Sequence, residues 1–240
     1  MCGRYALIDG KKVLVAYTVL NKTKLTDQVF QELPRYNAAP MQRLPVFAVR
    51  HDELVAETMQ WWLLPHWSKD GKPNFSAFNA KAETVDQSKL FAPYFKGSRC
   101  LVPADAFYEW RRVTTMQELR GTTKKVEEKH PMCIRMKDES PFLLAGLFSV
   151  WKDPEGNAHP TFTIITTEPN ELMAPIHNRM PVILPEQHLE QWLDRSYKDA
   201  DQLKKLLVPY PPQKMKAHRV SSFVSNSRNE GAECMKEVEK

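Results

Sequence analysis

Glycine is scarce in this sequence, with 8 residues among 240, whereas proline is frequent, with 18. The scarcity argues against a fold built around a Gly-rich nucleotide-binding loop, and the prolines indicate many stiffened, irregular connections. Long apolar runs are missing as well: the longest, Phe142 to Trp151, is interrupted by Gly146 and Ser149. A membrane-spanning helix needs about 20 apolar residues, so we expect no membrane span.

Cysteine is also sparse, and its four positions are widely spaced: Cys2, Cys100, Cys133 and Cys234. The sequence contains no CxxC pair and no Cys/His cluster, which argues against structural zinc and predicts a protein without a cofactor. The residues after Met1 do not form the apolar stretch of a secretory signal. Reduced thiols without an export signal predict a cytoplasmic protein.

The overall composition, 42% hydrophobic and 26% charged residues, is typical of a soluble globular protein that buries its own core. The net charge of +5 is compatible with a nucleic-acid partner but does not require one. The chain shows no internal repeat and no linker-like stretch. We therefore expect one domain over residues 1–240, present as a monomer.

Strand and helix patterns do not alternate as they do in βαβ folds, which predicts an α+β chain. The segment Arg35–Pro40 is predicted to be a loop because of its Asn and Pro. Residues 114–129 carry charges without an apolar period, so we interpret them as a solvated hairpin tip or a mobile insert. Strands are predicted at 2–8, 44–49, 54–62, 99–102, 107–110, 133–136, 142–150, 161–167 and 182–184, and helices at 11–20, 171–176 and 186–193.

The second residue is a cysteine, within the opening Met1-Cys2-Gly3-Arg4-Tyr5. A small second residue normally allows removal of the initiator Met, which would leave an amine and a thiol on Cys2. This 1,2-aminothiol condenses with an aldehyde to an imine and then closes a thiazolidine ring. The amine titrates near pH ~8 and the thiol near ~8.5, so both are usable close to neutrality. On position alone, an accident of a frayed terminus is the better interpretation.

Three polar residues lie in segments where catalytic groups are found. Glu109 stands among aromatic residues, a setting that raises a carboxyl pKa and suits a general acid or base; the competing interpretation is a surface Glu on an alternating strand. His177 lies in a loop bracketed by prolines, where catalytic groups concentrate, although a single His more often only packs or hydrogen-bonds. Asn79 precedes a predicted helix, so it also fits a helix cap.

Eight segments, in order, resemble one known family. They are Met1–Tyr5, Arg35–Pro40, Trp61-Trp62-Leu63-Leu64-Pro65, Asn79-Ala80-Lys81-Ala82-Glu83-Thr84, Arg99–Ala104, Phe107–Trp110, Ile176-His177-Asn178-Arg179-Met180-Pro181, and Val224-Ser225-Asn226 with Asn229-Glu230-Gly231. Their order and spacing resemble the SRAP domain, the SOS-response-associated peptidase family, from residue 2 to about residue 235. The resemblance implies a mixed, mostly antiparallel, barrel-like sheet flanked by helices.

The resemblance also implies an activity: capture of abasic sites in single-stranded DNA. The ring-opened sugar of an abasic site is an aldehyde, which Cys2 would trap as a thiazolidine and so shield from strand cleavage. Asn79 would position the sugar or the Cys2 amine, Glu109 would move protons, and His177 would bind the adjacent phosphate or the opened sugar. DNA contacts are implied for Arg4, Asn37, Pro40, Trp67, Lys81, Lys89 and Arg179, with Trp67 and the Asn37–Pro40 loop stacking or wedging the bases.

Two other functions remain open from the sequence. An N-terminal thiol with Glu and His nearby suits a thiol peptidase, including one that removes its own Met1. A non-covalent reader of modified or single-stranded DNA would need neither the thiol nor the proton-transfer groups. Thiazolidine chemistry in addition requires that Met1 is removed, because otherwise the terminal amine is not on Cys2.

Overall fold

The computed structural model describes residues 2–17, 20, 23–25, 29–72, 76–119 and 122–238. Five strands form a closed mixed barrel, because β11 pairs in parallel with β5 through Thr161↔Gln60 and Phe162↔Trp61 while the other neighbours are antiparallel. The barrel strands are β4 (Arg43–Arg50), β5 (Glu53–Trp61), β7 (Arg99–Ala104), β10 (Phe142–Lys152) and β11 (Ala158–Thr167). Two short strands, β6 (Asn79–Lys81) and β12 (Met180–Pro181), pair with the end of β11, and β2 (Lys24–Leu25) pairs with β5.

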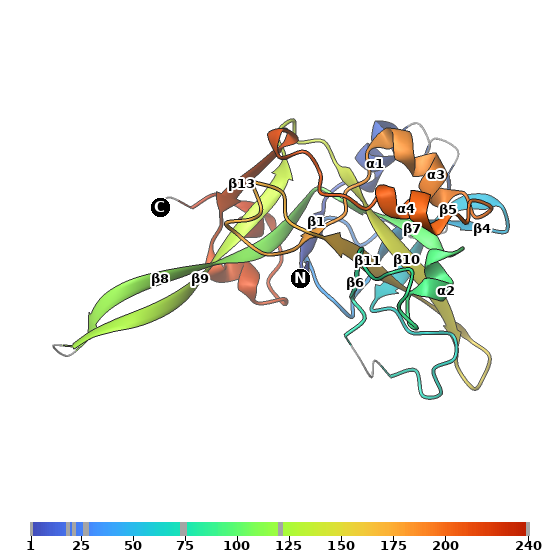
Figure 1. Ribbon diagram of the computed structural model, residues 1–240, viewed down its shortest axis with the longest axis horizontal. Coiled ribbons are helices and arrows are strands. Elements are labelled where there is room, and N and C mark those ends of the chain that lie inside the picture. Colours follow the sequence, from blue (N-terminus) through green and yellow to red (C-terminus); the bar gives the residue numbers. More distant parts are fainter. Residues whose placement is uncertain are drawn as a thin grey trace.

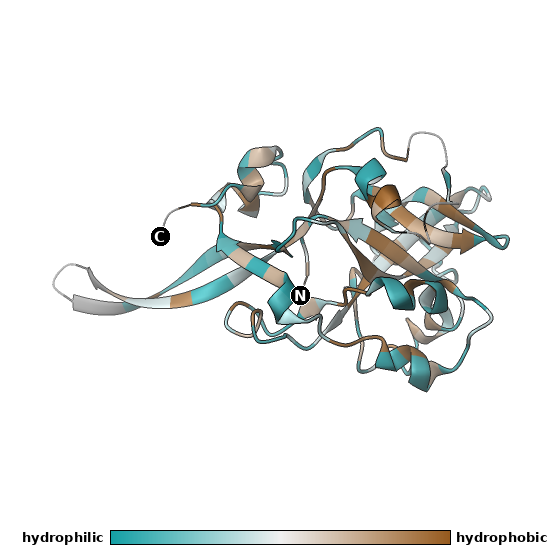
Figure 2. Cartoon of the chain, turned by 90° about the horizontal axis from the view of Figure 1, so that it is seen from above, coloured by the Kyte–Doolittle hydropathy of each residue, from teal (hydrophilic) through white to brown (hydrophobic). Residues whose placement is uncertain are grey.

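The barrel interior is packed with aromatic rings. Trp61 is completely buried and stacks on Phe162, with ring centroids 6.2 Å apart, and the ring of Tyr5 packs against it at a tilt, with centroids 5.2 Å apart. Strand β10 is buried at almost every position, as its mostly apolar sequence requires. Hydrophobic strands therefore concentrate in the barrel (Figure 2).

A second, antiparallel sheet lies beside the barrel, in the order β13-β9-β8-β1-β3. Its strands are β1 (Tyr5–Leu7), β3 (Arg35–Ala38), β8 (Ala106–Leu119), β9 (Thr122–Met136) and β13 (Met215–Arg219). Strands β8 and β9 outrun their neighbours and project as a two-stranded arm, while β1 lies where the arm meets the barrel (Figure 1). The start of the chain is thereby built into the middle of the molecule.

Short helices cover the barrel: α1, α3 and α4 lie along one side of it and α2 lies nearer the other (Figure 1). Asp9 caps α1, because its side chain accepts from the backbone N–H groups of Lys11 and Lys12. Among the described residues, no helix is long and apolar enough to cross a membrane. The helical segments are α1 (Gly10–Ala16), α2 (Ala92–Phe95), η2 (Glu186–His188), α3 (Leu189–Leu193), α4 (Ala200–Lys205), η3 (Pro212–Lys214), η4 (Ser222–Ser225) and η5 (Ala232–Met235).

The predicted fold class, a single α+β domain with a barrel-like mixed sheet, is confirmed. The prediction of a loop at Arg35–Pro40 is wrong, since Arg35–Ala38 is strand β3 and pairs with β1. The predicted helix at 171–176 is instead a series of turns, in which the Asn170 side chain and carbonyl accept from Met173 and Ala174. Asn turns of this kind compete with a regular helix.

Other boundaries also moved. Asn79 begins strand β6 and is followed by turns, so the helix-cap interpretation is wrong. Helix α1 ends at Ala16 rather than at residue 20, and the strand expected at 182–184 is β12 at Met180–Pro181 with one further bridge at Ile183. Residues 114–119 and 122–129 pair along β8 and β9, which confirms the hairpin interpretation of that stretch.

Candidate active site

Cys2 lies just before β1 and is completely buried in the main hydrophobic core. Strand β1 pairs with β8 through Tyr5↔Phe107, and the N–H of Tyr108 donates to the carbonyl of Arg4 at 3.0 Å. In an antiparallel pair, residue numbers rise along one strand as they fall along the other. Cys2, three residues before Tyr5, is therefore directed toward Glu109 and Trp110, which follow Phe107 on β8. The pairing of β1 with β8 therefore brings the start of the chain to Glu109, the carboxyl group that the sequence analysis singled out.

Glu109 is 3% exposed, on the strand between Tyr108 and Trp110. Burial raises the pKa of its carboxyl group to about 8, so it is mainly protonated at neutral pH. Burial also raises the pKa of the Cys2 thiol well above its usual range, and the charge of Glu109 raises it further. The thiol is therefore in its protonated form, and it lies within electrostatic reach of Glu109.

His177 faces the same carboxyl group from the turn before β12. Its Nε2 lies 3.8 Å from Oε2 of Glu109, and its Nδ1 lies 3.1 Å from the backbone N–H of Arg179, which can only donate. Burial lowers the pKa of His177, which favours the neutral ring, and its Nδ1 also lies 3.3 Å from the carbonyl oxygen of Arg179. At neutral pH the two groups form a neutral pair, with one proton on each, rather than an ion pair.

Asn79 is buried on β6, which runs parallel to the end of β11. Its Nδ2 donates to the carbonyl of Phe78 at 2.9 Å, and the indole N–H of Trp61 donates to the same oxygen at 2.8 Å. Its Oδ1 accepts no hydrogen bond from any residue that the structure describes. A buried acceptor of this kind is costly unless something donates to it, which is what a bound ligand with an N–H or O–H would do.

Arg4 and Asn37 are occupied by internal contacts. The guanidinium of Arg4 donates to Oδ1 of Asn37 at 2.8 Å and to the carbonyls of Val224 and Ser225 at 2.6 and 3.0 Å. Asn37 is fully buried, and its Nδ2 donates to three carbonyls in the same C-terminal stretch, those of Val224, Asn226 and Asn229. Both side chains therefore hold that stretch against β1 and β3.

The remaining predicted DNA contacts differ in how available they are. Arg179 grips the carboxylate of Glu83 with both Nη groups, at 2.6 and 2.9 Å, and is 14% exposed. Lys81 lies within electrostatic reach of Glu83, since its charge helps to lower the pKa of that carboxyl, although burial opposes the shift. Lys81 and Lys89 are exposed, and the described residues offer neither of them an ion-pair partner. Trp67 is 55% exposed on a loop, and Pro40 is partly buried in the turn after β3.

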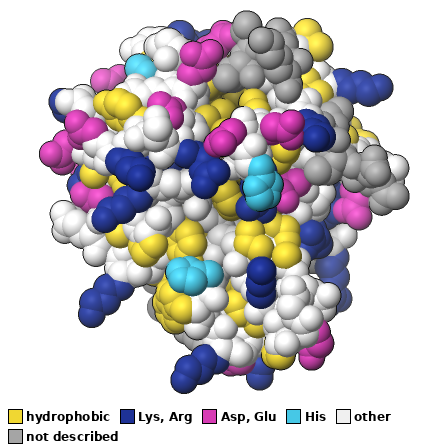
Figure 3. Space-filling view, turned by 90° about the vertical axis from the view of Figure 1, so that its right-hand side faces the viewer, with side chains coloured by type: hydrophobic (Ala, Val, Ile, Leu, Met, Phe, Trp, Pro, Cys, Tyr) yellow, Lys and Arg dark blue, Asp and Glu magenta, His cyan; other side chains and the backbone are white. Residues whose placement is uncertain are grey.

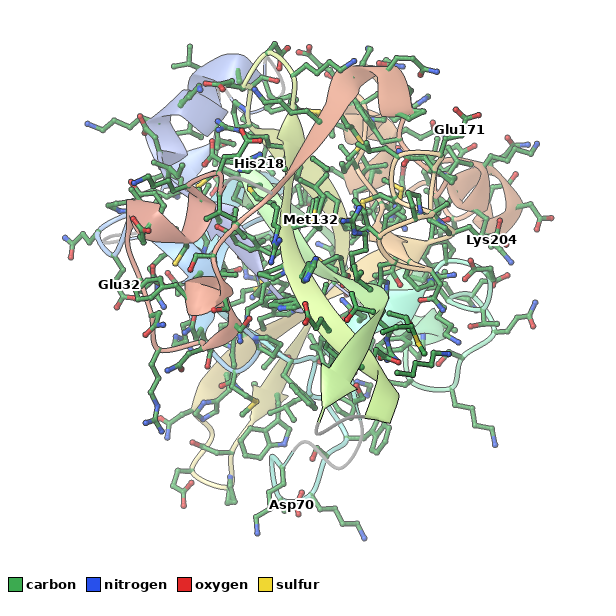
Figure 4. The ribbon with its side chains drawn as sticks, turned by 90° about the vertical axis from the view of Figure 1, so that its left-hand side faces the viewer. Glu32, Asp70, Met132, Glu171, Lys204 and His218 are labelled. Atoms are coloured by element: carbon green, nitrogen blue, oxygen red, sulfur yellow. The ribbon has the colours of Figure 1, made fainter. Side chains whose placement is uncertain are left out.

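The structure thus brings Cys2, Glu109 and His177 together, with Arg179 beside His177. Asn79 is linked to this region by Trp61. Both side chains donate to the carbonyl of Phe78, and Trp61 packs on Tyr5 of β1. Lys89 lies just before α2 and Trp67 on the loop after β5, and both side chains are exposed. Figure 4, seen from the side of the arm, shows Met132, the cross-strand partner of Glu109, near the middle of the molecule, with His218 to one side and Lys204 to the other.

Three contributors were not predicted from the sequence. Trp110 lies under the guanidinium of Arg4, at 5.8 Å, and its indole N–H donates to Oγ of Ser225 at 3.0 Å. Glu83 orients Arg179, and the charge of Arg112 on the arm is one of the influences that lower the pKa of His177. Glu83 and Trp110 lie within two of the family motifs, so the sequence marked their segments but did not predict their contacts. Nothing in the sequence pointed to Arg112, because only the fold brings the arm near His177.

These features define a class of protein: a mixed barrel in which Cys2, the second residue, is buried within electrostatic reach of a mainly protonated carboxyl group that a histidine faces. The family model described as "SOS response associated peptidase (SRAP)" matches residues 1–227. The chain belongs to the SRAP family.

Relatives and solved structures agree with that assignment. The abasic site processing protein YoqW of Bacillus subtilis is 37% identical over 97% of this chain and 98% of its own length. The abasic site processing protein HMCES of Rattus norvegicus is 32% identical over 84% of this chain and 64% of its own. A crystal structure of a protein from Bacteroides thetaiotaomicron is 26% identical with a TM-score of 0.79, covering 99% of this chain and 100% of that one.

Proposed function

We propose that this protein captures abasic sites in single-stranded DNA by forming a thiazolidine on Cys2 after removal of Met1. The relatives named above are abasic site processing proteins, which supports a role in handling that lesion. The observation that carries the covalent mechanism is the placement of a completely buried Cys2 within electrostatic reach of Glu109, itself paired with His177. The proposal also implies association with chromosomal DNA where it is single-stranded.

The first step is opening of the sugar ring. Opening needs a proton delivered to the ring oxygen and a proton removed from the hydroxyl on the anomeric carbon. Glu109 holds a proton up to a pH of about 8, so it is the donor to the ring oxygen. The carboxylate formed in this way takes the proton from the anomeric hydroxyl, which restores the carboxyl group, and neutral His177 faces it at 3.8 Å. In this proposal the free Oδ1 of Asn79 accepts from the sugar hydroxyl or the Cys2 amine.

The second step is ring closure on Cys2. The amine adds to the aldehyde carbon and water leaves, which gives an imine. The sulfur then adds to the same carbon, its proton passes to the nitrogen, and a five-membered ring closes. The protonated thiol suits this order, because the amine attacks first and the thiol needs to lose its proton only as the C–S bond forms.

The thiol-peptidase alternative is less well supported. A thiol that attacks an amide acts as a thiolate, usually with a pKa lowered by a basic neighbour. Burial and Glu109 both raise the pKa of Cys2, which opposes that role. A non-covalent reader would use the same basic surface but leaves the buried Cys2–Glu109–His177 group without a purpose.

Intact mass after mixing with abasic single-stranded DNA separates the three functions. Capture predicts a new species equal to protein plus DNA minus one water, formed only by the fraction of the protein that lacks Met1. The fraction that retains Met1 is the internal control, because its amine is not on Cys2. Cleavage of peptides without an adduct would favour the peptidase, and salt-sensitive binding without an adduct would favour the reader.

A further inference from the structure

A cavity of about 330 Å³ lies at the end of the barrel away from the candidate active site. Ser149 on its wall pairs with Thr161 near the start of β11, whereas Arg179 bonds to Thr166 near the end of that strand. Those two positions on β11 are about 17 Å apart at the rise of an extended strand. The volume is at the lower end of the range for small-ligand sites.

The lining of this cavity is basic. Arg50 contributes from the end of β4, His51 from the β4–β5 turn, His66 from the loop after β5, and Arg195 from the segment after α3. Figure 3 shows this side of the molecule, where histidine side chains lie near Lys and Arg side chains and near acidic ones. Within the described part of the chain, neither His51 nor Arg195 has an ion-pair partner.

Arg50 is held in place while its end stays available. Its Nε donates to the carboxylate of Glu57, and its guanidinium lies 4.6 Å from the centre of the Phe148 ring. Its two Nη groups donate to no other residue that the structure describes. His66 is fixed too, because its backbone N–H donates to the Tyr94 hydroxyl at 2.9 Å and its Nδ1 lies 3.0 Å from the same oxygen.

Ser149 supplies an independent sign that something binds here. The residue is 2% exposed and lines the cavity, yet its hydroxyl has no hydrogen-bond partner in the part of the chain that is described. A buried hydroxyl without a partner is unfavourable, and such groups in native structures call for an explanation. A ligand oxygen in the cavity would satisfy it.

We propose that this cavity binds a phosphate group. Guanidinium donors in a fixed orientation, imidazoles and a hydroxyl are the donors that phosphate oxygens accept from. The phosphate has two candidate sources, a free phosphate monoester such as a nucleotide, or the backbone of the DNA strand. The second source rests on the proposed function: Trp67, which follows His66, is exposed, and a strand stacked on it would pass this cavity.

The first test is independent of abasic-site chemistry. Inorganic phosphate, compared with chloride at equal ionic strength, is expected to raise Tm by about 3–5 °C at ten times its Kd. Ser149→Ala and Arg195→Ala should lose that rise, whereas Lys205→Ala, an exposed residue on α4 with the same change of charge, should keep it. Ser149→Ala should leave Tm in chloride unchanged, since it removes a hydroxyl without a partner.

The second test distinguishes the two sources. If the phosphate belongs to DNA, Arg195→Ala weakens binding of a long single strand and lowers its log–log salt slope by about 0.7, while capture of an abasic trinucleotide is unchanged. If it belongs to a free monoester, a mononucleotide competes with inorganic phosphate and long strands bind the variant as they bind the wild type.

The proposal is overturned if phosphate raises Tm no more than chloride does and Arg195→Ala binds long strands like the wild type. Ser149→Ala tests the proposal in a second way. A large fall in Tm in chloride would mean that the Ser149 hydroxyl already has a hydrogen-bond partner in the protein, which would contradict the premise of the proposal. A failure of abasic-site capture would be seen separately, as the absence of any covalent adduct in the wild type.

Discussion

The floor and the rim of the candidate active site are built on opposite principles. The floor consists of Cys2, Asn79 and Glu109, all buried, and burial holds the two ionisable groups in their neutral forms. The rim, which we propose to include the DNA contacts Lys81 and Lys89, is exposed, and the charges of these two residues face solvent. Chemistry therefore depends on exclusion of water, whereas affinity for a polyanion depends on groups that water can reach.

Arg4 and Arg179 show that residue type alone does not tell whether a side chain belongs to the floor or to the rim; the structure is needed to decide. From the sequence both belong with the rim, yet Arg4 donates to three internal acceptors and Arg179 to Glu83 and Thr166. Their charge contributes to the field around the site, but their donors are largely used. The comparison teaches that a basic residue in a motif can shape a site without touching the ligand.

The largest expected effect is that of Cys2→Ala. This variant should lose covalent capture completely while binding non-abasic single strands about as well as the wild type, since phosphate contacts supply most non-specific affinity. Adduct formation on denaturing gels and fluorescence anisotropy measure the two properties. Cys2→Ser is the matched control: it keeps the amine, so it should form a slower and more reversible adduct. If Cys2→Ala formed a heat-stable adduct at the wild-type rate, Cys2 would not be the residue that captures the DNA.

Glu109→Gln should slow capture by about 10²-fold or more, because it keeps the shape and removes the exchangeable proton. In the wild type, the acid form of Glu109 disappears as the pH rises through about 8, so the rate should fall on that side. The variant should lack this limb. Single-turnover rates between pH 5 and 9 test the prediction, and an unchanged rate and profile would make Glu109 a structural residue.

The same substitution should change how stability depends on pH. In the folded protein Glu109 keeps its proton up to about pH 8, whereas in the unfolded chain it releases it near the ordinary value of 4.5. Between those values the folded state binds more protons, so the free energy of unfolding falls as the pH rises. Glu109→Gln should flatten that slope. Urea unfolding at pH 5 and pH 8 measures it, and identical slopes in both proteins would contradict the raised pKa.

Asn37→Ala should be a stability variant rather than an affinity variant. It leaves the carbonyls of Val224, Asn226 and Asn229 without their common donor, which should lower the free energy of unfolding by about 2 kcal/mol. Folded variant protein should still bind single strands with the wild-type salt slope. A lower slope with unchanged stability would place Asn37 on the DNA instead.

The smallest expected effects belong to Lys81 and Lys89. Each Lys→Ala change should leave Tm unaltered and lower the log–log salt slope by about 0.7 if that side chain contacts one phosphate. Lys205→Ala, exposed on α4, is the control for loss of a charge. If Lys81→Ala and Lys89→Ala both keep the wild-type slope, the strand lies elsewhere on the surface.

The sequence was a better guide to which side chains lie together than to the local structure around them. The barrel strands were predicted because runs such as Phe142–Val150 are apolar apart from Gly146 and Ser149. Cys2, Glu109 and His177, which the structure brings together, were singled out through their motifs. The helix expected at 171–176 failed because Asn170 satisfies the turn that a helix would need. The internal bonds of Arg4 and Asn37 were out of reach, since their partners lie at Val224 and beyond and only the fold brings them near.

One measurement tests the central claim most directly: peptide mapping, by mass spectrometry, of the adduct formed with abasic single-stranded DNA without any reductant. The account predicts that the DNA remnant maps to an N-terminal peptide beginning at Cys2, and that borohydride does not alter its mass, because a thiazolidine has no C=N bond. An adduct that maps to a lysine such as Lys81, or that survives only after reduction, would contradict the account.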